Sequence, residues 1–244
     1  VIFLHGFTDR PKLASWYTGW TNLAQEEEFF IAYPKGLGAS WNAGFCCGKS
    51  WKENINDVFF IEKMIEQLQQ DYAIDRDRIY VVGFSNGGML AQRLIEDLPT
   101  TFAAAASVMA TPGDSTGARL DIGTNTPLLL AFGQLDRYIP VQEPRKDSPF
   151  YQMMPAEESR DYWKGHLNLE TPVTQASTSV YTEEVYGTPL SKPLLIYRMY
   201  TNQKHHWIDR RVESPRVIVP QFTRDVWEFL KQYKRRGSLN MDQI

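Results

Sequence analysis

Long apolar runs are absent from this sequence of 244 residues, and no stretch approaches the roughly 20 consecutive apolar residues that a membrane-spanning helix needs. A strong excess of either charge is also lacking. The formal net charge is -3 at pH 7, and the basic residues are scattered except for a short group between residues 231 and 236. We therefore expect neither a membrane nor a nucleic acid as a partner.

Cysteine is almost absent. The two cysteines, Cys46 and Cys47, are adjacent, and the Cα atoms of neighbouring residues lie only about 3.8 Å apart, below the usual range for a disulfide. Within one chain these two cysteines can form only a strained vicinal bridge or remain two free thiols. Buried loop thiols are the favoured interpretation. Adjacent cysteines without further ligands nearby also make a poor metal site, so we predict no metal.

The sequence also lacks an initiator methionine and a signal peptide. Residues 1–4 are apolar and are typical of the middle of a buried strand, so we expect a fragment or a processed chain in which N-terminal strands are missing. The compartment cannot be read from a targeting segment. Hydrophobic residues make up 43% of the sequence, which is enough for one substantial core. We predict a single domain over residues 1–236 and a flexible tail over residues 237–244.

The most informative stretch covers residues 80–89. A β-branched apolar run ends abruptly in glycine and serine, and apolar residues then recur at helical spacing. Gly83-x-Ser85-x-Gly87 is the pattern of a nucleophile elbow, in which a strained turn between a strand and a helix exposes the serine hydroxyl. Ser85 is therefore the candidate nucleophile.

Buried strands alternate with amphipathic helices along the rest of the chain. This alternation predicts a doubly wound, mostly parallel sheet with helices on both faces, as in the α/β hydrolases. The predicted strands cover residues 1–4, 29–33, 80–84, 102–109, 127–133 and 194–200. Ligands of such sheets bind beyond the carboxyl ends of the strands, where Ser85 and Asp136 are both expected.

Ser85, Asp136 and a histidine of the pair His205 and His206 follow three strands in the chain order of the α/β hydrolases. A serine hydroxyl is a weak nucleophile, so an imidazole has to accept its proton, and a carboxylate fixes the imidazole tautomer. The backbone N–H groups of Phe7 and Asn86 are the candidate oxyanion donors.

Two segments leave their roles open. The loop over residues 34–52 is rich in glycine and aromatic residues, and Trp41 and Trp51 either line a substrate cleft or pack the loop onto the body. Trp207, beside the histidine pair, is a third candidate for substrate binding. Residues 142–192 form either a lid over the site or a surface excursion.

The sequence resembles the polyhydroxybutyrate depolymerase-like esterases, which are related to the feruloyl and acetylxylan esterases of carbohydrate esterase family one. The matching stretches are Leu4-His5-Gly6, Ala32-Tyr33-Pro34, Trp41-Asn42-Ala43-Gly44, Cys46-Cys47-Gly48, Asp57-Val58 with Ile61, Gly83-Phe84-Ser85-Asn86-Gly87-Gly88-Met89, Phe132-Gly133 with Asp136, and His205-His206-Trp207. Members typically carry His-x-Trp, which implies His205 as the base. They are often secreted, which implies an extracellular location.

The chain departs from this family at two places: Ile208-Asp209 stands where Pro-Gly is common, and no Asn-Gly-Cys follows Trp163. Residues and resemblance together predict a cofactor-free serine carboxylic-ester hydrolase that forms an acyl-enzyme. Its expected substrates are feruloyl or acetyl esters of plant polysaccharide, or hydroxyalkanoate oligoesters. The alternatives are a serine peptidase of the same fold and a non-catalytic hydrolase-like binding protein.

Overall fold

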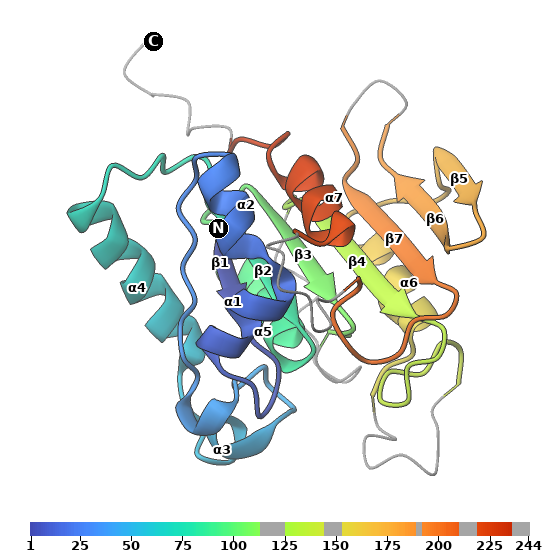
Figure 1. Cartoon of the computed structure of the whole chain (residues 1–244). Coiled ribbons are helices and arrows are strands. Elements are labelled where there is room, and N and C mark those ends of the chain that lie inside the picture. Colours follow the sequence, from blue (N-terminus) through green and yellow to red (C-terminus); the bar gives the residue numbers. More distant parts are fainter. Residues whose placement is uncertain (113–124, 144–152, 189–191, 210–218, 236–244) are drawn as a thin grey trace.

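The computed structural model describes residues 1–112, 125–143, 153–188, 192–209 and 219–235. These residues form a seven-stranded sheet in the order β1-β2-β3-β4-β7-β6-β5 (Figure 1). The parallel strands are β1 (Ile2–Leu4), β2 (Tyr80–Phe84), β3 (Ala104–Val108), β4 (Leu128–Gly133) and β7 (Leu195–Tyr200). The antiparallel strands at the far edge are β6 (Tyr181–Tyr186) and β5 (Thr174–Ser177). The predicted mostly parallel sheet is confirmed.

Helices cover both faces of the sheet because its central strands are buried on both sides, β3 and β4 along their whole length. One apolar core lies between the sheet and α4 (Asp57–Asp71), α5 (Asn86–Asp97) and α6 (Ala156–His166). The second lies under α1 (Pro11–Thr18), α2 (Trp20–Glu26) and α7 (Gln221–Leu230). Figure 1 shows α7 in front of the sheet and α6 behind it.

The strand predicted over residues 29–33 is wrong. Only Ala32 pairs with β1, through an isolated bridge to Ile2, and Phe30 is 57% exposed. None of residues 29–33 is fully buried, so this apolar run lacks the burial that a core strand has on both faces. A 3₁₀ turn (Leu37–Ala39) and a short helix, α3 (Gly48–Lys52), follow in the aromatic loop.

The described part of residues 142–192 extends the sheet and packs against it. The β5–β6 hairpin pairs with β7, and α6 buries Trp163 against the same core as α5. Residues 144–152 and 189–191 of this segment lie outside the described residues, as does the tail over 237–244, so the lid and the flexible tail stay predictions.

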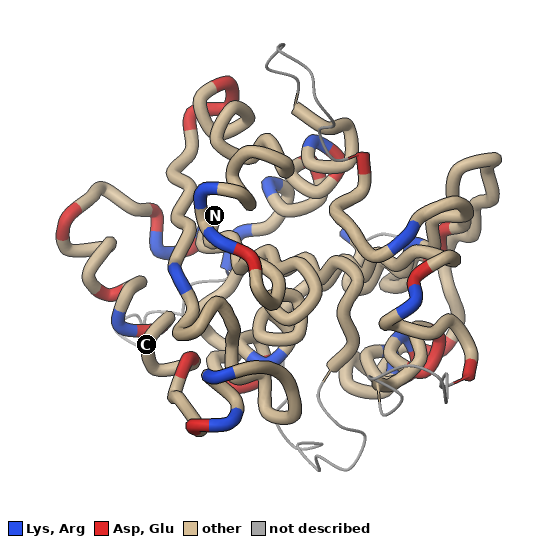
Figure 2. Tube along the Cα trace, turned by 60° about the horizontal axis from the view of Figure 1, so that its bottom comes forward, with Lys and Arg blue, Asp and Glu red and all other residues tan. Residues whose placement is uncertain are grey.

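Charges of both signs are interspersed along the described chain (Figure 2). None of the helices within the described ranges combines the length and the apolar character needed to cross a bilayer.

Candidate active site

Ser85 lies at a sharp turn between β2 and α5, with φ 52° and ψ -124°. Such a backbone conformation is costly for a residue with a side chain, and it persists only where neighbouring structure enforces it. Here the N–H of Ser85 donates to the carbonyl of Val108 on β3 (2.8 Å). A Cβ atom on Gly83 would lie 2.1 Å from the carbonyl oxygen of Gly87, so glycine is required where strand and helix meet this closely.

The structure brings Ser85, His205 and Asp136 together at the carboxyl edge of the sheet. His205 Nε2 is 2.8 Å from Ser85 Oγ, and His205 Nδ1 is 2.7 Å from Asp136 Oδ2. Asp136 is buried, and its other oxygen, Oδ1, accepts the backbone N–H groups of Tyr138 (2.8 Å) and Ile139 (3.1 Å). The carboxylate is therefore held by one oxygen and presents the other to His205.

The neighbouring His206 has different partners. Its Nδ1 lies 2.8 Å from Nε2 of Gln203 and 3.1 Å from the carbonyl oxygen of Trp207. Of the two histidines, His205 is the one that lies between the serine and the aspartate.

The two candidate oxyanion donors flank the nucleophile. Asn86 is the first residue of α5, where backbone N–H groups have no partner within the helix and the helix dipole favours negative charge. On the other side, a Cβ atom on Gly6 would lie 3.5 Å from Ser85 Cβ, so the Gly6-Phe7 peptide passes close to the serine. Neither N–H takes part in the backbone hydrogen bonds of the described turns and loops.

Two of the three tryptophans that are candidates for substrate binding are buried. Trp41 is 0% exposed, and its indole Nε1–H donates to the carbonyl of His5 (2.9 Å). Trp207 is 1% exposed and donates to Thr223 Oγ1 (3.0 Å) within the second core. Both indoles therefore have buried structural partners, which favours packing onto the body over substrate binding for these two residues. Trp51 on α3 is 44% exposed and stays a candidate.

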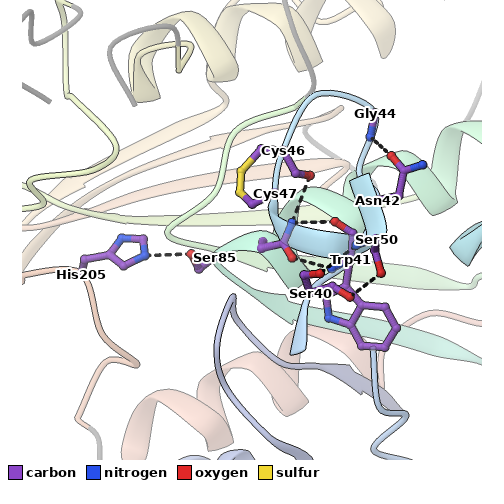
Figure 3. Close-up of a disulfide and its surroundings, with 10 residues drawn as sticks. Ser40, Trp41, Asn42, Gly44, Cys46, Cys47, Ser50, Ser85 and His205 are labelled. Carbon is purple, nitrogen blue, oxygen red and sulfur yellow. Dashed lines mark hydrogen bonds between the residues drawn. A yellow bond between two sulfur atoms is a disulfide. The ribbon is translucent and has the colours of Figure 1, made fainter. Parts of the chain in front are cut away.

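Cys46 and Cys47 form a disulfide, with a cis peptide bond between them. The favoured sequence interpretation, two free thiols, is therefore wrong. The bridge is the other of the two states that the sequence leaves open for adjacent cysteines. Figure 3 shows Ser85 between His205 on one side and the loop with this disulfide on the other.

His5, which follows β1, has structural partners. It is 1% exposed, and its Nε2 accepts the N–H of Gly36 (3.1 Å), which leaves Nδ1–H to donate to the carbonyl of Gly6 (2.8 Å). Burial lowers the pKa of His5 below its usual 6.5, which keeps the ring neutral.

Sequence reasoning missed two aromatic residues that flank His205. The ring of Tyr138 is T-shaped to the imidazole at a centroid distance of 4.8 Å, and the ring of Phe84 is tilted at 5.4 Å. Phe84 precedes Ser85 and Tyr138 lies two residues after Asp136, and this closeness in sequence could have indicated that both rings lie at the site. Among the described residues, no group of three or more histidine, cysteine or acidic side chains is arranged to hold a metal ion.

The family model for phospholipases and carboxylesterases matches residues 49–183, which is more than half of the chain. The chain belongs to the phospholipase/carboxylesterase family. This membership is consistent with the prediction of an esterase. It also agrees with the resemblance to esterases that the motifs indicate.

Several relatives of this chain are named as esterases or as a polyester depolymerase. It is 25% identical to the bifunctional acetylxylan esterase/xylanase XynS20E of Neocallimastix patriciarum, over 98% of this chain and 32% of that protein. It is 27% identical to poly(3-hydroxyalkanoate) depolymerase C of Paucimonas lemoignei, over 46% of this chain and 28% of that protein. The probable feruloyl esterase C of Aspergillus niger is 35% identical over 34% of this chain and 27% of that protein. The chain spans about a third of the length of these relatives.

Solved structures confirm the α/β-hydrolase fold of this family member. The acetyl xylan esterase from Aspergillus awamori aligns with a TM-score of 0.66 and 15% identity, over 94% of this chain and 87% of that one. An S-formylglutathione hydrolase from Agrobacterium tumefaciens aligns with a TM-score of 0.59 and 14% identity, over 97% and 83%. At these identities the likeness concerns the fold alone.

Proposed function

We propose that this chain is a serine carboxylic-ester hydrolase that acts through an acyl-enzyme. In this proposal Ser85 is the nucleophile, His205 is the general base and acid, and Asp136 orients the imidazole. The observation that carries it is the continuous hydrogen-bond chain from Asp136 through His205 to Ser85, with lengths of 2.7 and 2.8 Å. Those distances lie within the reach that proton transfer to a base requires.

The reaction runs in two halves. Ser85 Oγ attacks the ester carbonyl while His205 Nε2 takes its proton, and Asp136 Oδ2 keeps its bond to Nδ1–H of the imidazolium. The backbone N–H groups of Phe7 and Asn86 donate to the oxyanion of the tetrahedral intermediate. His205 then returns the proton to the leaving alcohol. In the second half water attacks the acyl-serine with His205 again as the base, and the acid product and free Ser85 result.

The proposed substrates are feruloyl or acetyl esters of plant polysaccharide, or hydroxyalkanoate oligoesters. The names of the acetylxylan esterase, feruloyl esterase and depolymerase relatives support these classes. Since Trp41 and Trp207 are buried, the aromatic candidates for substrate contact are Phe7 (40% exposed), Trp51 (44%) and Tyr138 (44%). Such rings suit sugar, phenolic and polyester groups alike. An extracellular location is part of the proposal, and the Cys46–Cys47 disulfide is compatible with an oxidising compartment.

The test uses the adjacent histidines as a matched pair. Wild type, His205→Ala and His206→Ala are treated with a fluorophosphonate, and the adduct is mapped by peptide mass spectrometry. We expect one adduct on Ser85 in wild type and in His206→Ala and almost none in His205→Ala. Hydrolysis of an aryl acetate should fall by about 10⁴-fold or more in His205→Ala alone, as when one member of such a triad is removed.

Two outcomes would count against the proposal. A folded wild-type protein that gains no adduct on Ser85 would exclude an activated serine. Equal labelling of the two histidine variants would exclude His205 as the base. A panel of feruloyl, acetyl and hydroxybutyryl esters, together with a matched peptide amide, then separates the substrate classes and the peptidase alternative.

A further inference from the structure

The side chain of Asn86 is buried beside the nucleophile and bonds to the aromatic loop. It is 1% exposed, and its Oδ1 accepts the backbone N–H of Trp41 (2.7 Å). Its Nδ2 donates to the carbonyls of Trp41 (3.0 Å) and Cys46 (3.2 Å). The residue whose backbone N–H is a candidate oxyanion donor is thus held through its side chain by the loop that carries the disulfide.

The loop is itself anchored to several elements. The indole of Trp41 donates to the carbonyl of His5 after β1 (2.9 Å). The N–H of Asn42 donates to Asp57 Oδ2 at the start of α4 (2.6 Å), and Arg93 Nη1 of α5 donates to the carbonyl of Asn42 (2.9 Å). The loop residues that bind the Asn86 side chain are therefore held in place by hydrogen bonds to the end of β1, to α4 and to α5.

The chemistry of the site requires an amide at position 86. One atom has to accept an N–H and another has to donate to two carbonyls, and an asparagine side chain supplies both. A carboxylate cannot donate, and an apolar side chain would leave buried partners without hydrogen bonds. Yet the oxyanion donor is the backbone N–H, which any residue except proline carries. The oxyanion role of the backbone N–H therefore does not explain why the side chain at position 86 is an asparagine.

We propose that the Asn86 side chain is a positioning residue, which aims the backbone N–H of Asn86 at the oxyanion by tying the start of α5 to the loop over residues 41–46. Three hydrogen bonds on a side chain with two rotatable bonds fix its rotamer and, through it, the backbone at the first residue of the helix. The inference rests on the proposed function, because the oxyanion forms only when Ser85 attacks an acyl carbonyl.

The test compares Asn86→Asp with Gln92→Glu. Gln92 lies on the same helix, is 0% exposed, and also makes three hydrogen bonds through its amide, with Ser107, Ala110 and Trp163. Both substitutions exchange a buried amide for an acid, but only one is next to Ser85. Each variant is measured for its melting temperature, for kcat and KM on an aryl acetate, and for the affinity of a boronic acid, which forms a tetrahedral anion on Ser85.

We expect both variants to melt at lower temperature and Gln92→Glu to keep its kcat. In Asn86→Asp, kcat should fall about 10- to 100-fold with little change in KM, since losing an oxyanion donor outright costs about 10² to 10³. The affinity for the boronic acid should fall in parallel with kcat. Asn86→Ala, which removes all three hydrogen bonds, should show the same split between kcat and KM.

Equal kcat values in Asn86→Asp and Gln92→Glu, with an active wild type, would overturn the inference and leave the proposed function standing. So would a change confined to KM, because it would assign the side chain to substrate binding. A folded wild type that neither hydrolyses esters nor binds the boronic acid would refute the proposed function, and the inference with it.

Discussion

At the scale of single residues, the two histidines that follow β1 and β7 have different surroundings. Both ring nitrogens of His5 are occupied by backbone groups of Gly6 and Gly36 inside the protein, whereas those of His205 lie against Ser85 and Asp136. Burial lowers the pKa of His5 and outweighs the opposing effects of the Gly6 carbonyl and the Asp9 carboxylate, so this ring resists protonation in the folded state.

This environment predicts a specific dependence of stability on pH. The unfolded chain takes up a proton at His5 as the pH falls through 6.5, whereas the folded chain takes it up only at lower pH. The contribution of neutral His5 is therefore complete above pH 6.5 and is lost progressively below it. We expect His5→Gln to be less stable than wild type at pH 8, because the contact between the imidazole and the Trp41 ring, with centroids 4.9 Å apart, is lost. The difference should shrink towards pH 5.

Urea unfolding of both proteins at pH 8, 6.5 and 5 measures this difference. The other three histidines are common to both proteins, so their titration cancels in the comparison. A free-energy difference that stays constant across the three pH values would contradict the lowered pKa of His5.

At the scale of elements, the turn between β2 and α5 depends on backbone contacts that leave no room for side chains. A Cβ atom on Gly87 would lie 2.1 Å from the carbonyl oxygen of Leu4 and 2.5 Å from that of His5. These are backbone atoms of β1 and its exit loop, which cannot move aside as a flexible side chain can. The start of α5 is thus seated directly on the end of β1.

Gly87→Ala should therefore destabilise the protein by about 3 kcal/mol or more, at the upper end of what forced overpacking costs. Gly165→Ala is the matched control, since Gly165 is an exposed residue of α6 with no atom within 4 Å of the added Cβ. It should stabilise the protein by about 0.5 to 1 kcal/mol through the better helix propensity of alanine. Chemical denaturation gives both values, and similar effects at the two sites would disprove the close approach at Gly87.

At the scale of the whole molecule, the last helix closes the core over the first two. Thr223 on α7 is 0% exposed, donates to the carbonyl of Thr18 (2.6 Å) and accepts the indole N–H of Trp207 (3.0 Å). Nearby, Phe29 stacks on Trp227 with ring centroids 4.1 Å apart. Segments some 200 residues apart in the sequence thus share one core. The buried Trp207 also packs in this core and anchors the loop that carries His205.

Thr223→Val keeps the shape of the side chain but leaves the carbonyl of Thr18 and the indole of Trp207 without this partner. We expect a loss of about 1 to 3 kcal/mol in the free energy of unfolding, the cost of unsatisfied buried polar groups. Thr21→Val, at an exposed threonine that contacts Tyr33, should change stability by less than about 0.5 kcal/mol. Equal changes in the free energy of unfolding for the two substitutions would show that the buried hydrogen bonds of Thr223 do not stabilise the protein.

Local pattern accounts for most of what was predicted correctly. The strands at 80–84 and 127–133 are continuous apolar runs, and the elbow around Ser85 is a short motif, so neighbouring residues suffice to indicate them. By contrast, β5 is exposed at every residue and β6 is only partly buried, so the hairpin lacks the hydrophobic pattern that marks a strand. It exists because β7 offers a free edge, and that edge is a property of the folded sheet.

The sequence by itself determined the parallel α/β architecture, the elbow at Ser85 and the chain order of Ser85, Asp136 and His205, because periodicity and short motifs act over neighbouring residues. Only the tertiary structure decided that Trp41 and Trp207 are buried, that Cys46 and Cys47 are bonded, and that Asn86 is tied to the aromatic loop. An aromatic or amide side chain has the same local chemistry in a cleft and in a core. Its surroundings are set by contacts with residues distant in the sequence.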